Sequence, residues 1–121
     1  MTSIRGIRGA NTVNDNTPSS ILGATRELLL AMVRENDVQV KDIVSIFFTL
    51  TPDLNAEFPA LAARDMGWSK VPLLCAAEID VPGAKSGCLR ILMHVQTSRS
   101  LEEIRHVYLG ETALLRPDLA Q

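Results

Sequence analysis

Alternating apolar and polar residues predict a strand most clearly at residues 88–97. Two sets of side chains alternate there: apolar Leu89, Ile91, Met93 and Val95, and a mixed set of Cys88, Arg90, Leu92, His94 and Gln96. Because successive side chains of a strand point to opposite faces, one face of this strand is apolar and the other is mixed. Further strands are predicted at residues 3–13, 42–50, 71–79 and 106–109.

Two helices are predicted between these strands. Thr17-Pro18 supplies an N-cap and a proline at the first helical position, and apolar residues then recur at helical spacing as far as Asn36. A shorter helix is predicted around residues 57–66, with Gly67 as its C-terminal cap. Residues 100–103 have the sequence of a capping box, which predicts one more brief helix.

These elements predict an α+β fold, with a mixed sheet of about five strands and one long and one short helix on one face. Two helices cannot cover both faces of such a sheet. The uncovered face is only partly polar, so we expect it to contact another subunit. All 121 residues are expected to form a single domain, with about residues 117–121 as a tail.

Composition narrows the class of protein. Hydrophobic residues make up 46% and charged residues 21%, a balance typical of globular domains. The net charge of −2 and pI near 5.6 argue against nucleic-acid binding. No segment has the ~20 apolar residues of a membrane span, and residues 1–10 lack the apolar run of a signal peptide. We therefore expect a cytoplasmic protein whose two cysteines are reduced thiols.

The basic residues are mostly arginine, nine out of twelve. Guanidinium groups bind carboxylates in planar, bidentate pairs that lysine cannot form. A carboxylate ligand is one explanation of this bias, and codon usage is another.

Six segments carry the candidate chemistry: RGIRG at 5–9, TPDLNAEFPA at 51–60, GWSKVPLLCAAEID at 67–80, CLRILMHVQT at 88–97, IRHVYL at 104–109 and LRPDL at 115–119. Their order and spacing closely resemble the trimeric chorismate mutases over essentially the whole chain. The resemblance implies a homotrimer whose sheets meet around the trimer axis as a pseudo α/β barrel, with sites between subunits. It also implies an isomerase of aromatic amino-acid biosynthesis that converts chorismate to prephenate and uses no cofactor or metal.

The resemblance assigns the chemical roles to four residues. Arg8, the second arginine of RGIRG, would bind a substrate carboxylate, as would Tyr108. Glu78 would accept a hydrogen bond from the ring hydroxyl. Arg90 would lie against the ether oxygen, which makes it the expected centre of catalysis.

The other residues that the resemblance implies form the wall and entrance of the pocket. They are Phe58, Ala60, Arg64, Leu73, Leu74, Cys75, Leu115 and Arg116. Arg64 would add positive charge near the entrance, and Leu115 and Arg116 would help to close the site. The position after Phe-Pro-Ala, often lysine in these enzymes, is Leu61 here, so one peripheral positive charge is missing.

The predicted residue types suit this reaction. The rearrangement takes place within one molecule and requires no nucleophile or proton shuttle, so His94 and His106 are expected to have structural roles. Fixed contacts to two carboxylates and a hydroxyl would hold the reactive pose. A guanidinium at the ether oxygen would stabilise the negative charge that develops there in the transition state.

One pair of candidates conflicts with strand geometry. Cys75 and Glu78 are three positions apart, so a regular strand would point them to opposite faces. Both can reach one ligand only if the strand bulges or ends between them.

Two other functions remain open at this stage. Small trimeric hydrolases that deaminate enamines and imines have a similar architecture and also bind a carboxylate with an arginine between subunits. A non-catalytic trimer that senses a metabolite would bind chorismate or an aromatic amino acid without converting it. Ammonia release from an enamine would identify the hydrolase, and binding without turnover would identify the sensor.

Overall fold

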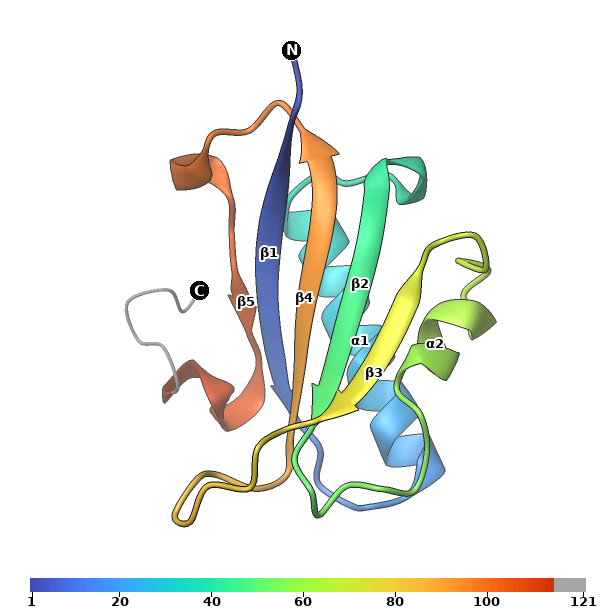
Figure 1. Cartoon of the computed structure of the whole chain (residues 1–121), viewed down its shortest axis with the longest axis vertical. Coiled ribbons are helices and arrows are strands. Elements are labelled where there is room, and N and C mark those ends of the chain that lie inside the picture. Colours follow the sequence, from blue (N-terminus) through green and yellow to red (C-terminus); the bar gives the residue numbers. More distant parts are fainter. Residues whose placement is uncertain (115–121) are drawn as a thin grey trace.

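The computed structural model describes residues 1–114, with side chains as far as Thr112 (Figure 1). Its helices and strands are β1 (Ser3–Thr12), α1 (Pro18–Glu35), β2 (Ile43–Leu50), α2 (Ala60–Asp65), β3 (Leu73–Ala77), β4 (Cys88–Thr97) and β5 (Val107–Tyr108). Short 3-10 helices lie at Val40–Asp42, Leu101–Glu103 and Gly110–Leu114.

The strands form one mixed sheet in the order β3-β2-β4-β1-β5. β4 lies at its centre and runs antiparallel to both neighbours, whereas β1 pairs with β5 and β2 with β3 in parallel. In Figure 1, α1 runs behind the sheet and α2 flanks it beside β3. The predicted α+β fold is confirmed, with five strands and two α-helices in the part of the chain that the structure describes.

The hydrophobic core lies between the sheet and the helices. Leu28 and Met32 on α1 are fully buried, as are Phe48 on β2 and Met93 on β4. The predicted start of α1 is confirmed, because the Thr17 hydroxyl accepts a hydrogen bond from the Ser20 N–H at 3.2 Å. The sheet face turned toward α1 is therefore the buried one.

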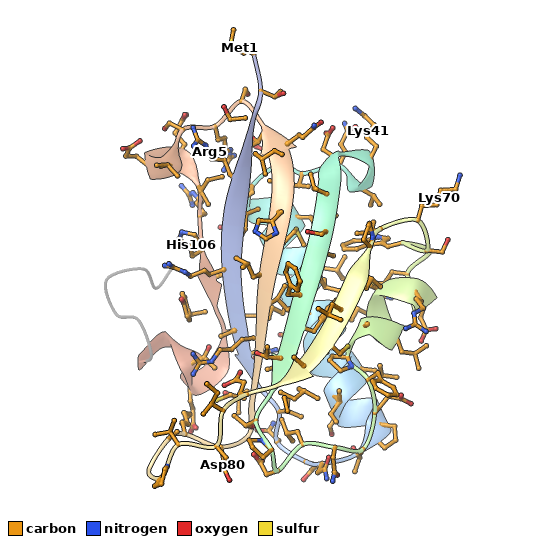
Figure 2. All side chains as sticks on the ribbon, in the orientation of Figure 1. Met1, Arg5, Lys41, Lys70, Asp80 and His106 are labelled. Atoms are coloured by element: carbon orange, nitrogen blue, oxygen red, sulfur yellow. The ribbon has the colours of Figure 1, made fainter. Side chains whose placement is uncertain are left out.

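The opposite sheet face, which we call the open face, carries no helix within residues 1–114 (Figures 1 and 2). One cross-strand row on it consists of Tyr108, Ala10, Arg90, Thr49 and Ala76, and the next of Arg8, Leu92, Phe47 and Leu74. The second row leaves large apolar side chains in solvent: Phe47 and Leu92 are each 39% exposed and Leu74 is 58% exposed. An open, partly apolar face was predicted from the alternation in β4.

Several predicted boundaries differ from the structure. The helix predicted at 57–66 begins only at Ala60, directly after Pro59, and the strand predicted at 71–79 is limited to Leu73–Ala77. The capping box is present, with the Ser100 N–H donating to Glu103 Oε1 at 2.9 Å. The 3-10 helix at Gly110–Leu114 was not predicted; its Glu111 N–H donates to the Thr12 hydroxyl at 3.0 Å. Across residues 1–114, no helix has the length and apolar character needed to cross a membrane.

Candidate active site

Three of the predicted polar residues surround one depression on the open face, which we call the arginine hollow. Its lining consists of Arg8, Gly9, Ala10, Phe47, Thr49, Arg90, Ile91, Leu92 and Tyr108. The volume is about 450 Å³, within the range of small-molecule sites. Strands far apart in the sequence build it, since β1, β4 and β5 supply one charged or phenolic side chain each.

Strand register explains why these three side chains converge. Ala10 pairs with Arg90 on one side and with Tyr108 on the other, so its methyl group lies between two large polar residues. Arg8 is two positions before Ala10 and therefore projects from the same face. A small residue flanked by long ones leaves room for a ligand between the polar groups.

Arg90 connects this hollow to Glu78. It also lines a neighbouring hollow of about 380 Å³ that contains Glu78, and its Nε lies 3.4 Å from Glu78 Oε2. The same carboxylate oxygen accepts a hydrogen bond from the Thr49 hydroxyl at 2.8 Å. The Arg90 side chain is 48% exposed and that of Glu78 only 17%, so the carboxylate is enclosed while the guanidinium remains accessible.

Arg8 contributes positive charge that no carboxylate among residues 1–114 neutralises. The ion pairs among residues 1–114 involve Lys41, Lys85, Arg90, Arg99 and Arg105, but not Arg8. Its backbone N–H donates to Nδ1 of His106 at 2.9 Å, just beyond the two residue pairs that join β1 to β5. Figure 2 labels His106 beside β1. The hollow therefore suits an anionic ligand, and His106 holds the backbone of one of its arginines.

A second depression, the phenylalanine hollow, contains Phe58 and Cys75. It has a volume of about 500 Å³ and is lined by Leu50, Thr51, Pro52, Leu54, Asn55, Ala56, Glu57, Phe58, Pro59, Cys75, Ala76 and Ala77. Asn16 fixes the loop that forms it, because Asn16 Oδ1 accepts hydrogen bonds from the N–H groups of Asn55 and Ala56 at 2.9 and 3.0 Å. Its lining is mainly apolar, and Phe58 is 69% exposed.

Two more predicted residues, Ala60 and Arg64, lie near Cys75. Burial raises the pKa of the Cys75 thiol, whereas the Ala60 N–H and the positive charge of Arg64 act to lower it. The net shift is upward, so Cys75 is a neutral thiol at pH 7 and can donate or accept only a weak hydrogen bond.

The exposed carboxylate of Asp53 anchors the loop between β3 and β4. Desolvation raises the pKa of Asp53, but hydrogen bonds from Thr51 and the Gly87 N–H outweigh it and hold the pKa below its ordinary value. Asp53 Oδ2 accepts the Gly87 N–H at 3.0 Å. This loop includes Glu78 at its start, so Asp53 helps to define the hollow next to Arg90. Within residues 1–114, no three His, Cys, Asp or Glu side chains are grouped to hold a metal ion.

Comparison with known proteins gives the family. A family model described as chorismate mutase type I matches residues 4–119. The chain belongs to the type I chorismate mutase family. It is 47% identical over 118 residues to chorismate mutase AroH of Bacillus subtilis, covering 97% of this chain and 93% of that protein. Chorismate mutase AroH of Thermus thermophilus is 48% identical over 117 residues, covering 96% of each.

A solved structure agrees with this family. Chorismate mutase from Clostridium thermocellum matches the chain with a TM-score of 0.90 at 48% identity, covering 91% of this chain and 98% of that one. The resemblance of the six sequence segments to chorismate mutases is therefore confirmed.

Within one chain, the predicted type I mutase residues fall into two separate groups. The arginine hollow is lined by Arg8, Arg90 and Tyr108, and the phenylalanine hollow by Phe58 and Cys75. Leu74 projects from the open face, while Leu73 packs against the core. The predicted contacts of Leu115 and Arg116 lie outside the described residues.

The geometric conflict between Cys75 and Glu78 is real. Cys75 packs against the core on the helix side, whereas Glu78 bonds to Thr49 on the open face. β3 ends at Ala77, between the two, but its end does not bring them into one hollow of this chain. Strand alternation alone was sufficient to predict that separation.

Sequence reasoning missed six lining residues of the arginine hollow, which are Gly9, Ala10, Phe47, Thr49, Ile91 and Leu92. Each looks like an ordinary strand residue, and its position beside the arginines depends on the pairing of β4 with β1 and β2. The alternation in residues 88–97 did place Leu92 and Arg90 on one face, which was the available signal.

Proposed function

We propose that this protein catalyses the intramolecular rearrangement of chorismate to prephenate, in the route to phenylalanine and tyrosine. The observation that carries the proposal is the arginine hollow, in which Arg8, Arg90 and Tyr108 converge beside Glu78. Chorismate carries two carboxylates, one ring hydroxyl and an ether oxygen. Two guanidiniums, a phenol and a carboxylate are complementary to those groups.

Arg90 is assigned to the ether oxygen. Its Nε faces Glu78, so the terminal Nη groups of its planar fork remain for the ligand. In this rearrangement the carbon–oxygen bond breaks ahead of carbon–carbon bond formation, and negative charge develops on the ether oxygen. A guanidinium fixed there stabilises the transition state more than the ground state, which raises kcat.

The other polar residues are assigned to the pose of the substrate. Arg8 and Tyr108 bind carboxylates, and Glu78 accepts a hydrogen bond from the ring hydroxyl. Contacts at three separated points would hold the enolpyruvyl arm over the ring, and such restraint supplies a large part of the rate enhancement in intramolecular reactions. The protein acts without a nucleophile, because all bonds are made and broken within chorismate.

A homotrimer is the second part of the proposal. The two hollows each contain half of the expected site, and Phe47, Leu74 and Leu92 expose apolar surface on the open face. If the open faces meet around a threefold axis, the phenylalanine hollow of one subunit can approach the arginine hollow of the next. Each site would then receive Phe58, Cys75 and Arg64 from one chain and the arginine hollow from its neighbour. We assign the protein to the cytoplasm.

The reaction is tested by incubating the purified protein with chorismate and following the loss of its ultraviolet absorbance, with prephenate identified by mass spectrometry. Parallel incubation with an enamine tests for ammonia release. Prephenate formation without ammonia is the expected result. Ammonia release without chorismate loss would favour the hydrolase, and saturable chorismate binding without turnover would favour a sensor.

Mixing two inactive variants tests the shared site. Arg90→Ala disables the arginine hollow and Phe58→Asp disables the phenylalanine hollow. After co-refolding of equal amounts into mixed trimers, about a quarter of the interfaces should combine two intact halves and restore about that share of wild-type activity. Activity that stays at the level of the separate variants would place both halves within one chain and contradict the arrangement.

A further inference from the structure

We propose that Thr49 is a positioning residue for this reaction and acts by holding the Glu78 carboxylate beside Arg90. This inference rests on the proposed function, because it depends on Glu78 contacting the substrate. Thr49 lies on β2, opposite Arg90 in the neighbouring strand β4. The resemblance to known mutases assigned no role to it.

The contact is direct and directional. Thr49 Oγ1 donates to Glu78 Oε2 at 2.8 Å, and Arg90 Nε approaches the same oxygen at 3.4 Å. One carboxylate oxygen is therefore bound from two sides. Among the described residues no hydrogen bond engages Oε1 of Glu78, so this oxygen is the one that can accept the hydroxyl of a ligand.

Glu78 requires such support because the sheet does not orient its side chain. It follows Ala77, the last residue of the edge strand β3, and its backbone N–H donates to the Leu50 carbonyl at 2.9 Å. A glutamate side chain gives up considerable rotamer freedom when it is held in one place. The Thr49 hydroxyl supplies that restraint on the face where Arg90 lies.

The ion pair with Arg90 is the weaker of the two restraints. Its 3.4 Å separation is longer than a charge-assisted hydrogen bond, and the Arg90 side chain is 48% exposed. Pairs that are accessible to solvent contribute little. Arg90 is also the group expected to turn toward the substrate, so a separate donor is needed to keep Glu78 in place.

A matched pair of substitutions tests the role of the hydroxyl. Thr49→Val keeps the shape and removes the donor, whereas Thr49→Ser keeps the donor. We expect kcat/KM for chorismate to fall about 10- to 100-fold in the valine variant, from the loss of a hydrogen bond to a charged group. The serine variant should remain within about threefold of wild type. Equal losses in both would overturn the proposal, as would no loss in the valine variant.

A double-mutant cycle tests whether Thr49 acts through Glu78. In the Glu78→Ala background, with enzyme in excess over chorismate, Thr49→Val should change the rate less than about twofold. A full further loss there would mean that Thr49 acts independently of Glu78, and would overturn the proposal.

Crystal structures of the wild type and the valine variant separate this inference from the proposed function. The wild-type Glu78 carboxylate should lie at the Thr49 hydroxyl, and it should leave that position in the valine variant. If wild type fails to convert chorismate, the proposed function is wrong, whatever those structures show. If wild type is active but Glu78 stays in place without the hydroxyl, only the positioning role is wrong.

Discussion

Replacing Gly9 by alanine should destabilise the fold at the point where β1 meets α1. A Cβ at this position would lie 2.4 Å from Met32 Sδ and 3.1 Å from Leu28 Cδ1. Both side chains are fully buried, and Gly9 is paired on both sides in the sheet, with Ile91 and with Val107. β1 therefore cannot move away from α1 without losing its strand pairing, so the core side chains of Met32 and Leu28 must shift to accommodate the new methyl group.

The size of the effect follows from that geometry. Overpacking a well-filled core costs about 1–3 kcal/mol, and the flexible thioether of Met32 favours the middle of this range, about 2 kcal/mol. For a chain of this length, that corresponds to a fall in Tm of about 6–12 °C. Gly23→Ala on α1 is the matched control, because its Cβ would meet nothing within 4 Å. Alanine there should stabilise the helix by about 0.5–1 kcal/mol.

Urea unfolding of the three proteins measures both changes. All samples must have the same protein concentration, since the stability of the proposed trimer would depend on that concentration. The free energy of unfolding should decrease for Gly9→Ala and increase for Gly23→Ala. A Gly9→Ala protein as stable as wild type would refute the packing argument, and equal destabilisation by both variants would show that loss of glycine itself is the cause.

Three further predictions concern the site and the open face. His106→Ala should raise KM for chorismate several-fold, because the Arg8 N–H loses its acceptor. His106→Asn, which offers an oxygen near the position of Nδ1, should restore the wild-type KM, and equal KM values in both variants would contradict this role of His106. Cys75 should be alkylated slowly by iodoacetamide at pH 8, because burial raises its pKa, and more slowly still in Arg64→Ala, which removes a charge that favours the thiolate. Mass spectrometry of the modified peptide measures the rate, and faster alkylation in Arg64→Ala than in wild type would contradict this expectation. Leu92→Asp should dissociate the proposed trimer and abolish activity, since it introduces charge into the exposed apolar row. An unchanged mass in analytical ultracentrifugation would rule out contact through that row.

Local signals in the sequence predicted most of the fold. The start of α1 was predictable because Thr17 and Pro18 act on the helix within one turn, and the end of α2 because Gly67 adopts a positive φ of 87°. The faces of β4 followed from strict alternation. The short β5 and the 3-10 helix at Gly110–Leu114 depend on contacts with β1, almost 100 residues away. The local pattern therefore indicated β5 only as a short strand and did not indicate the 3-10 helix.

The candidate site was predictable in its charged residues and not in their surroundings. Arg8, Arg90 and Tyr108 came from a family resemblance, which is confirmed, and their convergence on one hollow follows from the pairing of both Arg90 and Tyr108 with Ala10. Thr49 has no distinguishing sequence feature, because its hydrogen bond to Glu78 requires β2 and β3 to be paired. The roles of all these residues in catalysis remain predictions.

The central claim is that a fixed guanidinium at Arg90 drives the conversion of chorismate. The most direct measurement is the rate of chorismate loss with wild type, Arg90→Ala and Arg90→Lys, all in metal-free buffer containing a chelator. We expect rapid loss with wild type and at least roughly a 10²–10³-fold lower kcat with alanine. Lysine should also fail, because it keeps the charge but not the planar fork. Near-normal kcat with lysine would remove Arg90 from the central role, and no chorismate loss with folded, oligomeric wild type would contradict the account as a whole.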